Sequence, residues 1–369
     1  MKKPVIYILE PSKVGVQHLS FLESYLQTII NTKKVSDIFD INFVASKKTI
    51  DKLDKSKLMI VNLSTILVID PLKRRLVLKT IVEAFQVLKL MLKKKRDDKL
   101  LITCLLPTSL IFIEQINRIL KKRGIYVVLH GEIESLFDST KQSIFRIGWW
   151  SRFWWKLRSA DSKIKLVVID DFIKDRIDKI CINKNDIAVI HQPIIPLEKS
   201  IPSDPIPKVC FVGYRTKNKG YREFIALAEK HPKLEFVAIG GEVEENIRTG
   251  KKNILRTHDD YLDAISSCSL ALFLYTDGYR ATLSGAALDA IKLGVTILAL
   301  NRPFFVSISD HLGDKIVAIR EDFLQVSEYL DNLQYLQSHK LESSSLILQS
   351  KYSVKAIAKK MDEIFLGDQ

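Results

Sequence analysis

One loop in the C-terminal half of the chain combines residue types that suit the binding of a phosphate or diphosphate. Residues 275–285 contain Thr276, Thr282 and Ser284 together with two glycines, and Ser284 and Gly285 come directly before a helical segment. The first backbone amides of a helix have no partner within it and lie at its positive end, so anions bind there. Hydroxyl groups and an unhindered glycine backbone would let such a ligand approach closely.

The segments that flank this loop have the pattern of a βαβ unit. Residues 270–274 and 295–300 are short apolar runs, which are typical of buried strands. Between them a helix ends at Gly294. Its apolar face consists of Ala286, Ala287, Ala290 and Ile291. An ordinary crossover of a parallel sheet, whose loop is polar only because water covers it, explains the same pattern, so the rest of the chain has to decide.

Strand-like and helix-like segments alternate along most of the chain, which predicts parallel βαβ units. In the first half the expected strands are 5–9, 41–45, 59–61 or 66–69, 100–105, 125–130, 166–169 and 187–190. The expected helices there are 17–30, 71–95, 109–122 and 171–180. The alternation resumes with a strand at 208–213, a helix at 219–229, strands at 234–239 and near 254, and a helix at 259–266.

A proline-rich passage separates the two halves. Five prolines fall between positions 193 and 207, and so dense a group continues neither a helix nor a central strand. We therefore expect a domain over 1–195, a linker over 196–207, a second domain over 208–350 and a C-terminal helix within 351–369 that packs back on the first domain. The predicted fold class is α/β, with two doubly wound, Rossmann-like domains that face a cleft.

Composition is that of a folded chain large enough for two cores. The 369 residues are 47% hydrophobic. The apolar run 5–9 is too short for a signal peptide, and the longest nearly uncharged apolar segment, 100–113, is interrupted by Pro107. We expect no transmembrane helix. The four cysteines lie far apart, three of them in or beside apolar runs, which indicates buried thiols in a reducing compartment and no metal cluster.

The net charge also differs between the two halves of the chain. Residues 1–200 hold 36 Lys and Arg against 21 Asp and Glu, a net charge of +15, whereas residues 201–369 have a net charge of −1. The whole excess of +14 therefore belongs to the N-terminal half. This asymmetry predicts two domains with different partners, one of them anionic.

The start of the second half resembles a known enzyme family. Residues 209–229 form a strand that ends in Val-Gly, a basic loop, and Lys-Gly at the start of a helix. This order is similar to the donor-side motif of retaining GT-B glycosyltransferases of the family 4 type. The loop and helix at 275–294 follow about 60 residues later and resemble the second signature of that family, E-x7-E followed by an Ala-rich turn and Gly. The resemblance covers the C-terminal domain well and the N-terminal domain only loosely.

The resemblance implies roles for particular residues. Arg215 and Lys219 match the basic residues that contact the diphosphate of a nucleotide sugar, with Lys217 as a further candidate. Asp289 matches the later Glu, which binds the ribose hydroxyls, and Ser284 and Gly285 offer a hydroxyl and amides to the diphosphate. The earlier Glu of the motif falls on Ala281, and this departure puts the donor sugar and the activity itself in question.

The N-terminal domain is then expected to supply the acceptor side. Gly15, in the loop after the first strand, is the position where the backbone would approach the sugar phosphate. His130 and Gly131 follow the strand expected at 125–130 and resemble the His-Gly that this family has at its cleft. A lone His is often structural, so His130 and, as the alternative, Glu132 are the candidate catalytic residues.

All four tryptophans lie in one basic segment. Trp149, Trp150, Trp154 and Trp155 alternate with cations such as Arg152, a composition that suits the interface of an anionic bilayer. Lys94 and Lys95, at the end of a long amphipathic segment, form a second basic patch. Packing in the core explains part of the aromatic group, and nucleic acid would also use cations and stacking, but no nucleic-acid-binding motif is present.

Together these features predict a cytoplasmic glycosyltransferase, peripheral on the inner face of a membrane, that moves a sugar from a nucleotide-sugar donor to a lipid-linked or cell-surface glycan intermediate. The resemblance implies that the anomeric configuration is retained. No Asp-x-Asp metal motif occurs in a suitable loop, so we expect no metal and no cofactor. The alternative is an inactive GT-B-like binding or partner subunit, for which Ala281 is the main argument.

Overall fold

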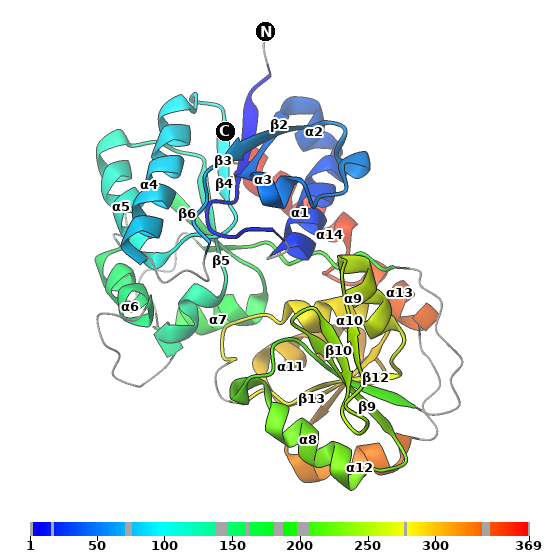
Figure 1. Cartoon of the computed structure of the whole chain (residues 1–369). Coiled ribbons are helices and arrows are strands. Elements are labelled where there is room, and N and C mark those ends of the chain that lie inside the picture. The colour runs from blue at the N-terminus through cyan, green and yellow to red at the C-terminus, as the bar shows by residue number, and fades with distance from the viewer. Residues whose placement is uncertain are drawn as a thin grey trace. The chain divides into compact units, whose positions relative to one another are not determined.

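A computed structural model places the chain in two compact units, which are described separately (Figure 1). The structure describes residues 3–15, 18–70, 76–137, 147–158, 162–180, 187–197, 207–276, 279–333 and 340–367. The N-terminal unit comprises Met1–Pro193 and Val354–Gln369, and the C-terminal unit comprises Ile194–Ser353. The change from one unit to the other thus falls at the start of the proline-rich passage.

The N-terminal unit is built on a parallel sheet of seven strands. Their order is β3-β2-β1-β4-β5-β6-β7, and every neighbouring pair is parallel. The strands are β1 (Val5–Leu9), β2 (Asp40–Ser46), β3 (Val61–Ile66), β4 (Lys99–Ile102), β5 (Ile125–Leu129), β6 (Ile164–Val168) and β7 (Ile187–Val189). This is the strand order of a doubly wound, Rossmann-like domain, in which the direction of winding reverses between β1 and β4.

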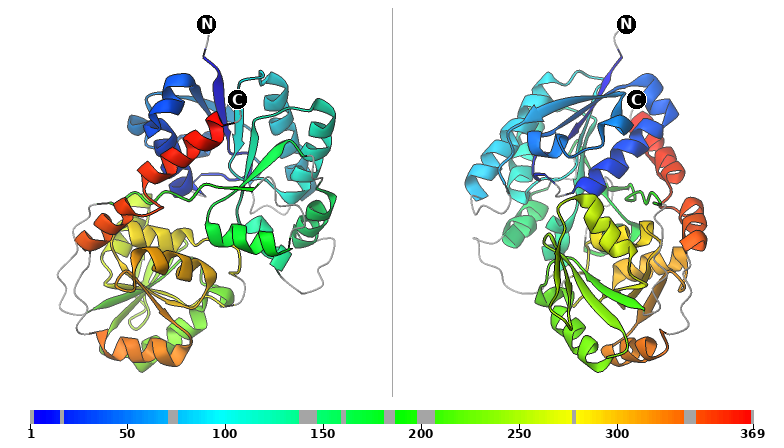
Figure 2. Two further views of the ribbon diagram at one scale, coloured as in Figure 1. Left: turned by 180° about the vertical axis from the view of Figure 1, so that it is seen from behind. Right: turned by 45° about the vertical axis from the view of Figure 1, so that its right-hand side comes forward.

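Helices cover both faces of this sheet. Those of the unit are α1 (Leu19–Asn31), α2 (Lys33–Ile38), α3 (Lys47–Ile50), α4 (Leu76–Lys93), α5 (Pro107–Leu120), α6 (Ile147–Leu157), α7 (Asp171–Ile180) and α14 (Val354–Leu366). Helices α4, α5 and α6 lie side by side on one face, and α1, α2 and α14 lie together on the other (Figures 1 and 2). The last helix is fixed to this sheet by Tyr126, whose hydroxyl donates to the carbonyl of Ile364 over 3.2 Å and whose ring contacts Phe365.

The C-terminal unit is also doubly wound, but one edge of its sheet is antiparallel. Its strand order is β11-β10-β9-β8-β12-β13-β14. The strands are β8 (Lys208–Val212), β9 (Glu235–Gly240), β10 (Val243–Asn246), β11 (Lys252–Ile254), β12 (Leu270–Phe273), β13 (Thr296–Leu300) and β14 (Val317–Arg320). The helices are α8 (Tyr221–Lys230), α9 (His258–Ser266), α10 (Gly285–Lys292), α11 (Pro303–Leu312), α12 (Phe323–Asp331) and α13 (Lys340–Gln349). Strands β9, β8, β12, β13 and β14 pair in parallel, but β10 is antiparallel to both β9 and β11.

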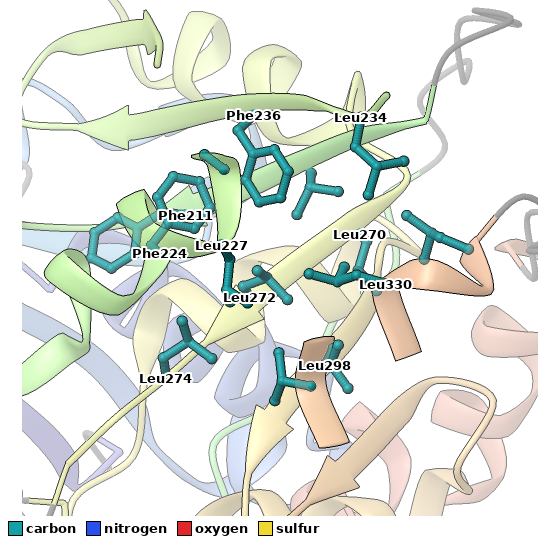
Figure 3. Packing of buried hydrophobic residues seen from close by; sticks show 14 of the residues in the cluster. Phe211, Phe224, Leu227, Leu234, Phe236, Leu270, Leu272, Leu274, Leu298 and Leu330 are labelled. Atoms are coloured by element: carbon teal, nitrogen blue, oxygen red, sulfur yellow. The ribbon is translucent and has the colours of Figure 1, made fainter. Parts of the chain in front are cut away.

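The core of this unit lies between the sheet and two helices. Phe211, Leu272 and Leu298 come from three adjacent strands and meet side chains of α8 and α12, including Phe224 and Leu330 (Figure 3). All of these residues are buried. Burial of apolar surface is the main favourable term in folding, and this packing fixes the ends of β8 and β12 against each other.

Most elements agree with the sequence-based prediction, and the differences have simple causes. The third strand was expected at 59–61 or 66–69, whereas β3 occupies the residues between. It is an edge strand with only one side toward the core, and it contains the polar residues Asn62 and Ser64. Its sequence is therefore not an apolar run. Uniformly parallel pairing was also wrong for β10 and β11, which form a hairpin of mostly polar residues. Within the described residues, no helix is both long and apolar enough to cross a membrane.

Candidate functional site

Each unit has a point at which the winding of its sheet reverses, and the loops there are the natural ligand sites of such folds. In the C-terminal unit the reversal lies between β8 and β12, so the loops after Val212 and Phe273 leave the sheet side by side. In the N-terminal unit it lies between β1 and β4, where the loops after Leu9 and Ile102 do the same. Most of the residues expected to do chemistry fall in these four loops or in the helices that follow them.

Lys219 is held against the end of β8 by two glycines. Gly213 has φ +117°, and a Cβ there would lie 2.6 Å from the Nζ of Lys219, so a side chain at this position would displace the ammonium group. Gly220 has φ +74° and lies so close to β12 that a Cβ would be 2.2 Å from the carbonyl oxygen of Leu274. The chain therefore turns tightly from the short 3-10 helix η3 (Lys217–Lys219) into α8, and Lys219 lies inside that turn.

Tyr275 connects Lys219 to the start of α10. The Nζ of Lys219 lies 5.7 Å from the centre of the Tyr275 ring, and the Tyr275 hydroxyl is 2.7 Å from the Oγ of Ser284. Ser284 is the N-cap of α10 and its Oγ accepts a hydrogen bond from the amide of Ala287. The preceding amides, those of Gly285 and Ala286, have no partner among the described residues. A cation thus lies over the ring of Tyr275, and the first amides of α10 lie near its hydroxyl.

The two loops of this unit are also bonded directly to each other. The amide of Thr276 donates to the carbonyl of Asn218 over 3.0 Å, and the Nε of Arg302 donates to the carbonyl of Tyr275 over 2.8 Å. The first bond fixes the backbone just before Lys219, and the second fixes the loop that carries Tyr275. The site is preorganised in this sense, because a ligand would not have to order the loops as it binds.

The environment of Lys219 leaves its charge without a counter-charge. Burial lowers the pKa of its ammonium group below the ordinary value. No ion pair or hydrogen bond to a carboxylate compensates it within the part of the chain that the structure describes. A half-buried cation without an anion is costly, and an anionic ligand would remove that cost.

Arg215 and Asp289 differ from Lys219 because each already has a partner. Arg215 forms an ion pair with Glu245 on β10, and its guanidinium lies 5.7 Å from the centre of the Tyr221 ring. Asp289 is buried on α10, with its Oδ1 2.7 Å from the Nζ of Lys292. The expected contacts of these two residues with diphosphate and ribose stay predictions. Either contact would have to exchange or share an existing partner.

The corresponding loops of the N-terminal unit contain a buried carboxylate. Glu10, the residue after β1, has no exposed surface. It accepts hydrogen bonds from the amides of Ser12 and Lys13 and from the hydroxyl of Thr103, which follows β4. Its Oε2 lies 3.6 Å from the Nδ1 of His18. Burial works against the charge, yet the nearby imidazole of His18, together with these donors, lowers the pKa of the Glu10 carboxyl below its usual value.

His18 was not assigned a role from the sequence, although it is the histidine with this carboxylate behind it. It lies at the N-cap of α1 in a left-handed conformation, φ 61°, and its side chain is 24% exposed. A carboxylate next to one ring nitrogen favours the tautomer with the proton on that nitrogen, which leaves the other nitrogen to accept a proton. An acidic residue directly after the first strand, eight residues before a histidine, was the signal in the sequence.

His130 lies beside His18. Their ring centres are 4.7 Å apart, and both rings contact Phe21. The Nε2 of His130 lies 2.8 Å from the carbonyl oxygen of Thr103, a contact in which that nitrogen is the donor. His130 is therefore oriented by the backbone, whereas His18 faces a carboxylate. The side chain of Glu132, the alternative catalytic residue, lies outside the described side chains.

A second buried carboxylate, on α4, also bonds to the loop after β1. Glu83 on α4 accepts hydrogen bonds from the hydroxyls of Ser12 and Ser109 and lies 3.6 Å from the Nζ of Lys79. Burial raises the pKa of the Glu83 carboxyl, although Lys79 and the hydrogen bonds act against the shift. Gly15, further along the loop, has φ +67° and donates its amide to the hydroxyl of Thr49. Its amide is thus already used, although a Cβ there would meet no atom within 4 Å.

The aromatic segment is only partly a surface. Trp149 and Trp150 are half-buried on α6, and Trp149 stacks on the exposed Phe153 with ring centres 5.1 Å apart. Trp155 and Arg152 are also half-buried. Trp154 is buried, which removes it from the predicted membrane surface. Its position is the inward side of an amphipathic helix, so core packing accounts for this one tryptophan.

The second predicted basic patch is likewise divided. Lys95 is exposed, but Lys94 is buried and its Nζ donates to the carbonyl of Lys95. Burial lowers the pKa of Lys94 to about 8, with Lys99 and Lys122 adding repulsion while Asp98 opposes the shift. Lys94 therefore does not belong to the surface patch predicted for it.

One group of side chains in the described residues has the spacing of metal ligands. Asp170 and Asp171 follow β6 and His191 follows β7, and one ligand atom from each lies within 4.8 Å of the others. The Nε2 of His191 is 2.9 Å from the Oδ2 of Asp171, so this pair is already hydrogen-bonded. The group lies at the β6–β7 edge of its sheet, away from the reversal point between β1 and β4, and the expectation of a metal-independent reaction stays a prediction.

Comparison with known proteins finds solved structures with a similar fold. No protein-family model and no curated protein sequence matches the chain. Among solved structures, HepE from Anabaena in complex with UDP-glucose has a TM-score of 0.65 and 13% identity, over 99% of both chains. Sucrose-phosphate synthase from Thermosynechococcus elongatus has a TM-score of 0.69 and 11% identity, again over 99% of both chains. A glycosyltransferase from Rickettsia africae has a TM-score of 0.59 and 10% identity, over 100% of this chain and 99% of that one. With two Rossmann-like units and these structural neighbours, the chain has the GT-B fold.

Proposed function

We propose that the protein is a glycosyltransferase that transfers a sugar from a nucleotide-sugar donor to an acceptor. The observation that carries this proposal is Lys219, a half-buried cation with no carboxylate partner among the described residues, next to the N-terminal amides of α10 at the reversal point of the C-terminal sheet. Folds of this kind bind ligands at that point. The structural neighbour HepE, which was crystallised with UDP-glucose, supports a nucleotide sugar as the ligand.

The donor chemistry follows from the charges. When the bond between sugar and diphosphate breaks, negative charge grows on the leaving diphosphate. A fixed ammonium group and oriented amides stabilise that charge more than they stabilise the intact donor, which is the condition for lowering a barrier. Lys219 and the first turn of α10 supply this positive potential, so the proposed reaction needs no divalent metal and no cofactor. Asp289 as the ribose ligand and Arg215 as a second phosphate ligand complete the proposed donor site.

The acceptor chemistry is proposed for the N-terminal unit. His18, backed by Glu10, has the geometry of a general base that takes a proton from an acceptor hydroxyl, while His130 supports its ring. Retention of configuration, which the family resemblance implied, stays a prediction. Direct attack by a deprotonated hydroxyl instead inverts the anomeric carbon, so the anomeric configuration of the product, read by NMR, distinguishes the two routes.

The proposed acceptor is a lipid-linked or cell-surface glycan intermediate at the cytoplasmic face of a membrane. Two features support this. The N-terminal half carries the entire net positive charge of the chain, and aromatic side chains of α6 are partly exposed beside cations. Cys104, Cys210 and Cys268 are free and buried, as expected in a reducing compartment.

A binding experiment followed by a turnover experiment tests the proposal. Thermal unfolding is measured with UDP, GDP and their sugar conjugates, and we expect one nucleotide to raise the midpoint. Lys219→Met should abolish most of that shift. Lys230→Met is the matched control, because Lys230 is exposed at the far end of α8. Absence of stabilisation by any nucleotide at millimolar concentration would refute the enzyme, and stabilisation without hydrolysis or transfer would favour the inactive binding subunit.

A further inference from the structure

Helix α4 carries a row of large apolar side chains that face solvent. Val77, Ile81, Phe85 and Leu92 are 73%, 58%, 62% and 60% exposed. The first three recur every four residues and Leu92 follows seven after Phe85, so all four lie on one side of the helix. A single exposed apolar residue is ordinary, but a row of four along most of one helix is not.

The opposite side of the same helix is unusually polar for a buried surface. Lys79, Thr80 and Glu83 point inward and are buried, with Lys79 donating to the carbonyl of Ser12 and Thr80 bonded to the hydroxyl of Thr108. The first half of α4 is therefore inverted, with polar residues toward the sheet and apolar residues toward water. Folding of the unit explains the buried polar side, because these groups anchor the loop after β1. It does not explain the apolar outer row.

The neighbouring helices extend this surface. Helix α5 packs beside α4, and α6 packs beside α5, where Arg118 donates to the carbonyl of Leu157 (Figures 1 and 2). On α5, Phe112 and Ile119 are exposed one above the other, seven residues apart. On α6, Phe153 and Leu157 are exposed as well. The exposed apolar residues thus form a face across three adjacent helices, which we call the α4–α6 face.

Charge on this face is mostly positive. Helices α4, α5 and α6 contain only two carboxylates in their sequences, Glu83 and Glu114. Both are buried and ion-paired, the first with Lys79 and the second with Arg158. The exposed charged residues of α4, α5 and α6 are all cations, namely Lys89, Lys93, Arg118 and Lys156, and the turn after α4 exposes Lys95 and Arg96 beside one carboxylate, Asp97. An occupant of the α4–α6 face is therefore apolar and anionic at once.

We propose that the α4–α6 face binds the surface of an anionic lipid bilayer, with α4 lying along it. The apolar row would enter the boundary between headgroups and acyl chains, while the lysines beside it would meet lipid phosphates. Aliphatic side chains do not stack with bases, which argues against single-stranded nucleic acid as the occupant. This inference rests on the membrane part of the proposed function and specifies which surface of the protein contacts the membrane. The contact is centred on α4 rather than on the tryptophan segment.

Vesicle co-sedimentation of the full chain tests the inference. Vesicles of phosphatidylcholine with phosphatidylglycerol are compared with vesicles of phosphatidylcholine alone, at two salt concentrations. We expect binding only to the anionic vesicles, weakened by salt. The double variant Ile81→Glu with Phe85→Glu should weaken binding at least about tenfold, and Lys89→Glu with Lys93→Glu should do the same. Leu324→Glu is the matched control, since Leu324 is 62% exposed on α12 of the other unit, and it should bind as the unchanged protein does.

The outcomes separate this inference from the proposed function. Equal binding to both kinds of vesicle, or unchanged binding by both double variants, would overturn it. A concentration-dependent dimer that the Ile81→Glu and Phe85→Glu variant abolishes would identify a second copy as the occupant, and tighter binding to single-stranded DNA than to vesicles would identify nucleic acid. Thermal shift by nucleotide is measured on each variant and should be unchanged, which also shows that the variants fold. Vesicle binding by a protein that no nucleotide stabilises would refute only the glycosyltransferase.

Discussion

The two reversal points of this molecule have the same topology and opposite electrostatics. In the C-terminal unit, the loops after β8 and β12 hold a half-buried lysine for which the described part of the chain provides no carboxylate partner. In the N-terminal unit, the loops after β1 and β4 hold a buried glutamate that is surrounded by donors and faces a histidine. One site is short of negative charge. The other already contains it.

This difference teaches that strand order selects where a site lies but not what it binds. The charge at each point is set by a few residues whose partners are distant in the sequence. A positive site at a helix N-terminus suits a diphosphate, whereas a carboxylate behind an imidazole suits proton removal from a hydroxyl. The proposed division of labour between donor and acceptor follows from that contrast, and each prediction below tests one side of it.

The largest effect is expected at His18. Replacing it with Asn removes the proposed base, and turnover should fall by roughly 100-fold to 10,000-fold, the usual contribution of general base catalysis. The thermal shift produced by nucleotide should not change, because His18 belongs to the other unit. His130→Asn should lower turnover less, since the Nε2 of His130 is held by the carbonyl of Thr103. A larger loss for His130 than for His18 would reverse these two roles.

In the C-terminal unit, Lys219 and Arg215 should contribute unequally to nucleotide affinity. Loss of a charged hydrogen bond costs about 1.5–3 kcal/mol, so Lys219→Met should weaken binding by about tenfold to 100-fold. Arg215→Gln should weaken it less, because Arg215 is already neutralised by Glu245 in the free protein. Isothermal titration with the best nucleotide measures both constants. Equal losses would mean that the Arg215–Glu245 pair opens when the ligand binds.

Two glycines in equivalent loops provide a comparison of packing. Gly15 and Gly220 both have positive φ, +67° and +74°, but a Cβ at Gly15 meets nothing within 4 Å, whereas one at Gly220 would overlap the carbonyl of Leu274. Both Ala variants bear a similar backbone cost, and Gly220→Ala should lose about 1–3 kcal/mol more from overpacking. Chemical denaturation measures the difference. Similar losses would show that the turn at Gly220 can relax.

The smallest expected effect is the pH dependence of nucleotide binding. Burial lowers the pKa of Lys219 in the free protein, and a bound anion would favour its protonated form. Affinity should therefore decline as the pH rises through the lowered pKa of Lys219, at a lower pH than an exposed lysine would require. Titrations in buffers of different ionisation enthalpy should also show proton uptake on binding near that pKa. The Lys219→Met variant should lack both effects, and an identical pH profile in that variant would exclude Lys219 as their source.

The sequence was sufficient for the architecture because the relevant signals are local. Apolar runs of four to six residues gave most strands, and helical periodicity gave the helices between them, within a few residues of their ends. The site was partly accessible for the same reason. Lys219 follows a strand directly, and Ser284 precedes an apolar helical face, so both could be assigned to loops at the carboxyl ends of strands. The edge strand β3 was misplaced and β10 was missed because their residues are largely polar, whereas β11 lies where a strand near 254 was expected.

By itself, the sequence determined the alternation of elements, the proline-rich boundary, the excess of positive charge in the first half and the loops in which chemistry is expected. Only the tertiary structure decided which charged groups have partners. Glu245 lies 30 residues from Arg215 in the chain, and Thr103 lies 93 residues from Glu10, so these contacts depend on strand order rather than on spacing. It also showed that Trp154 and Lys94 are buried and that α4 presents its apolar row to water. Burial is a property of packing, because periodicity defines the sides of a helix but the neighbouring elements decide which side they cover.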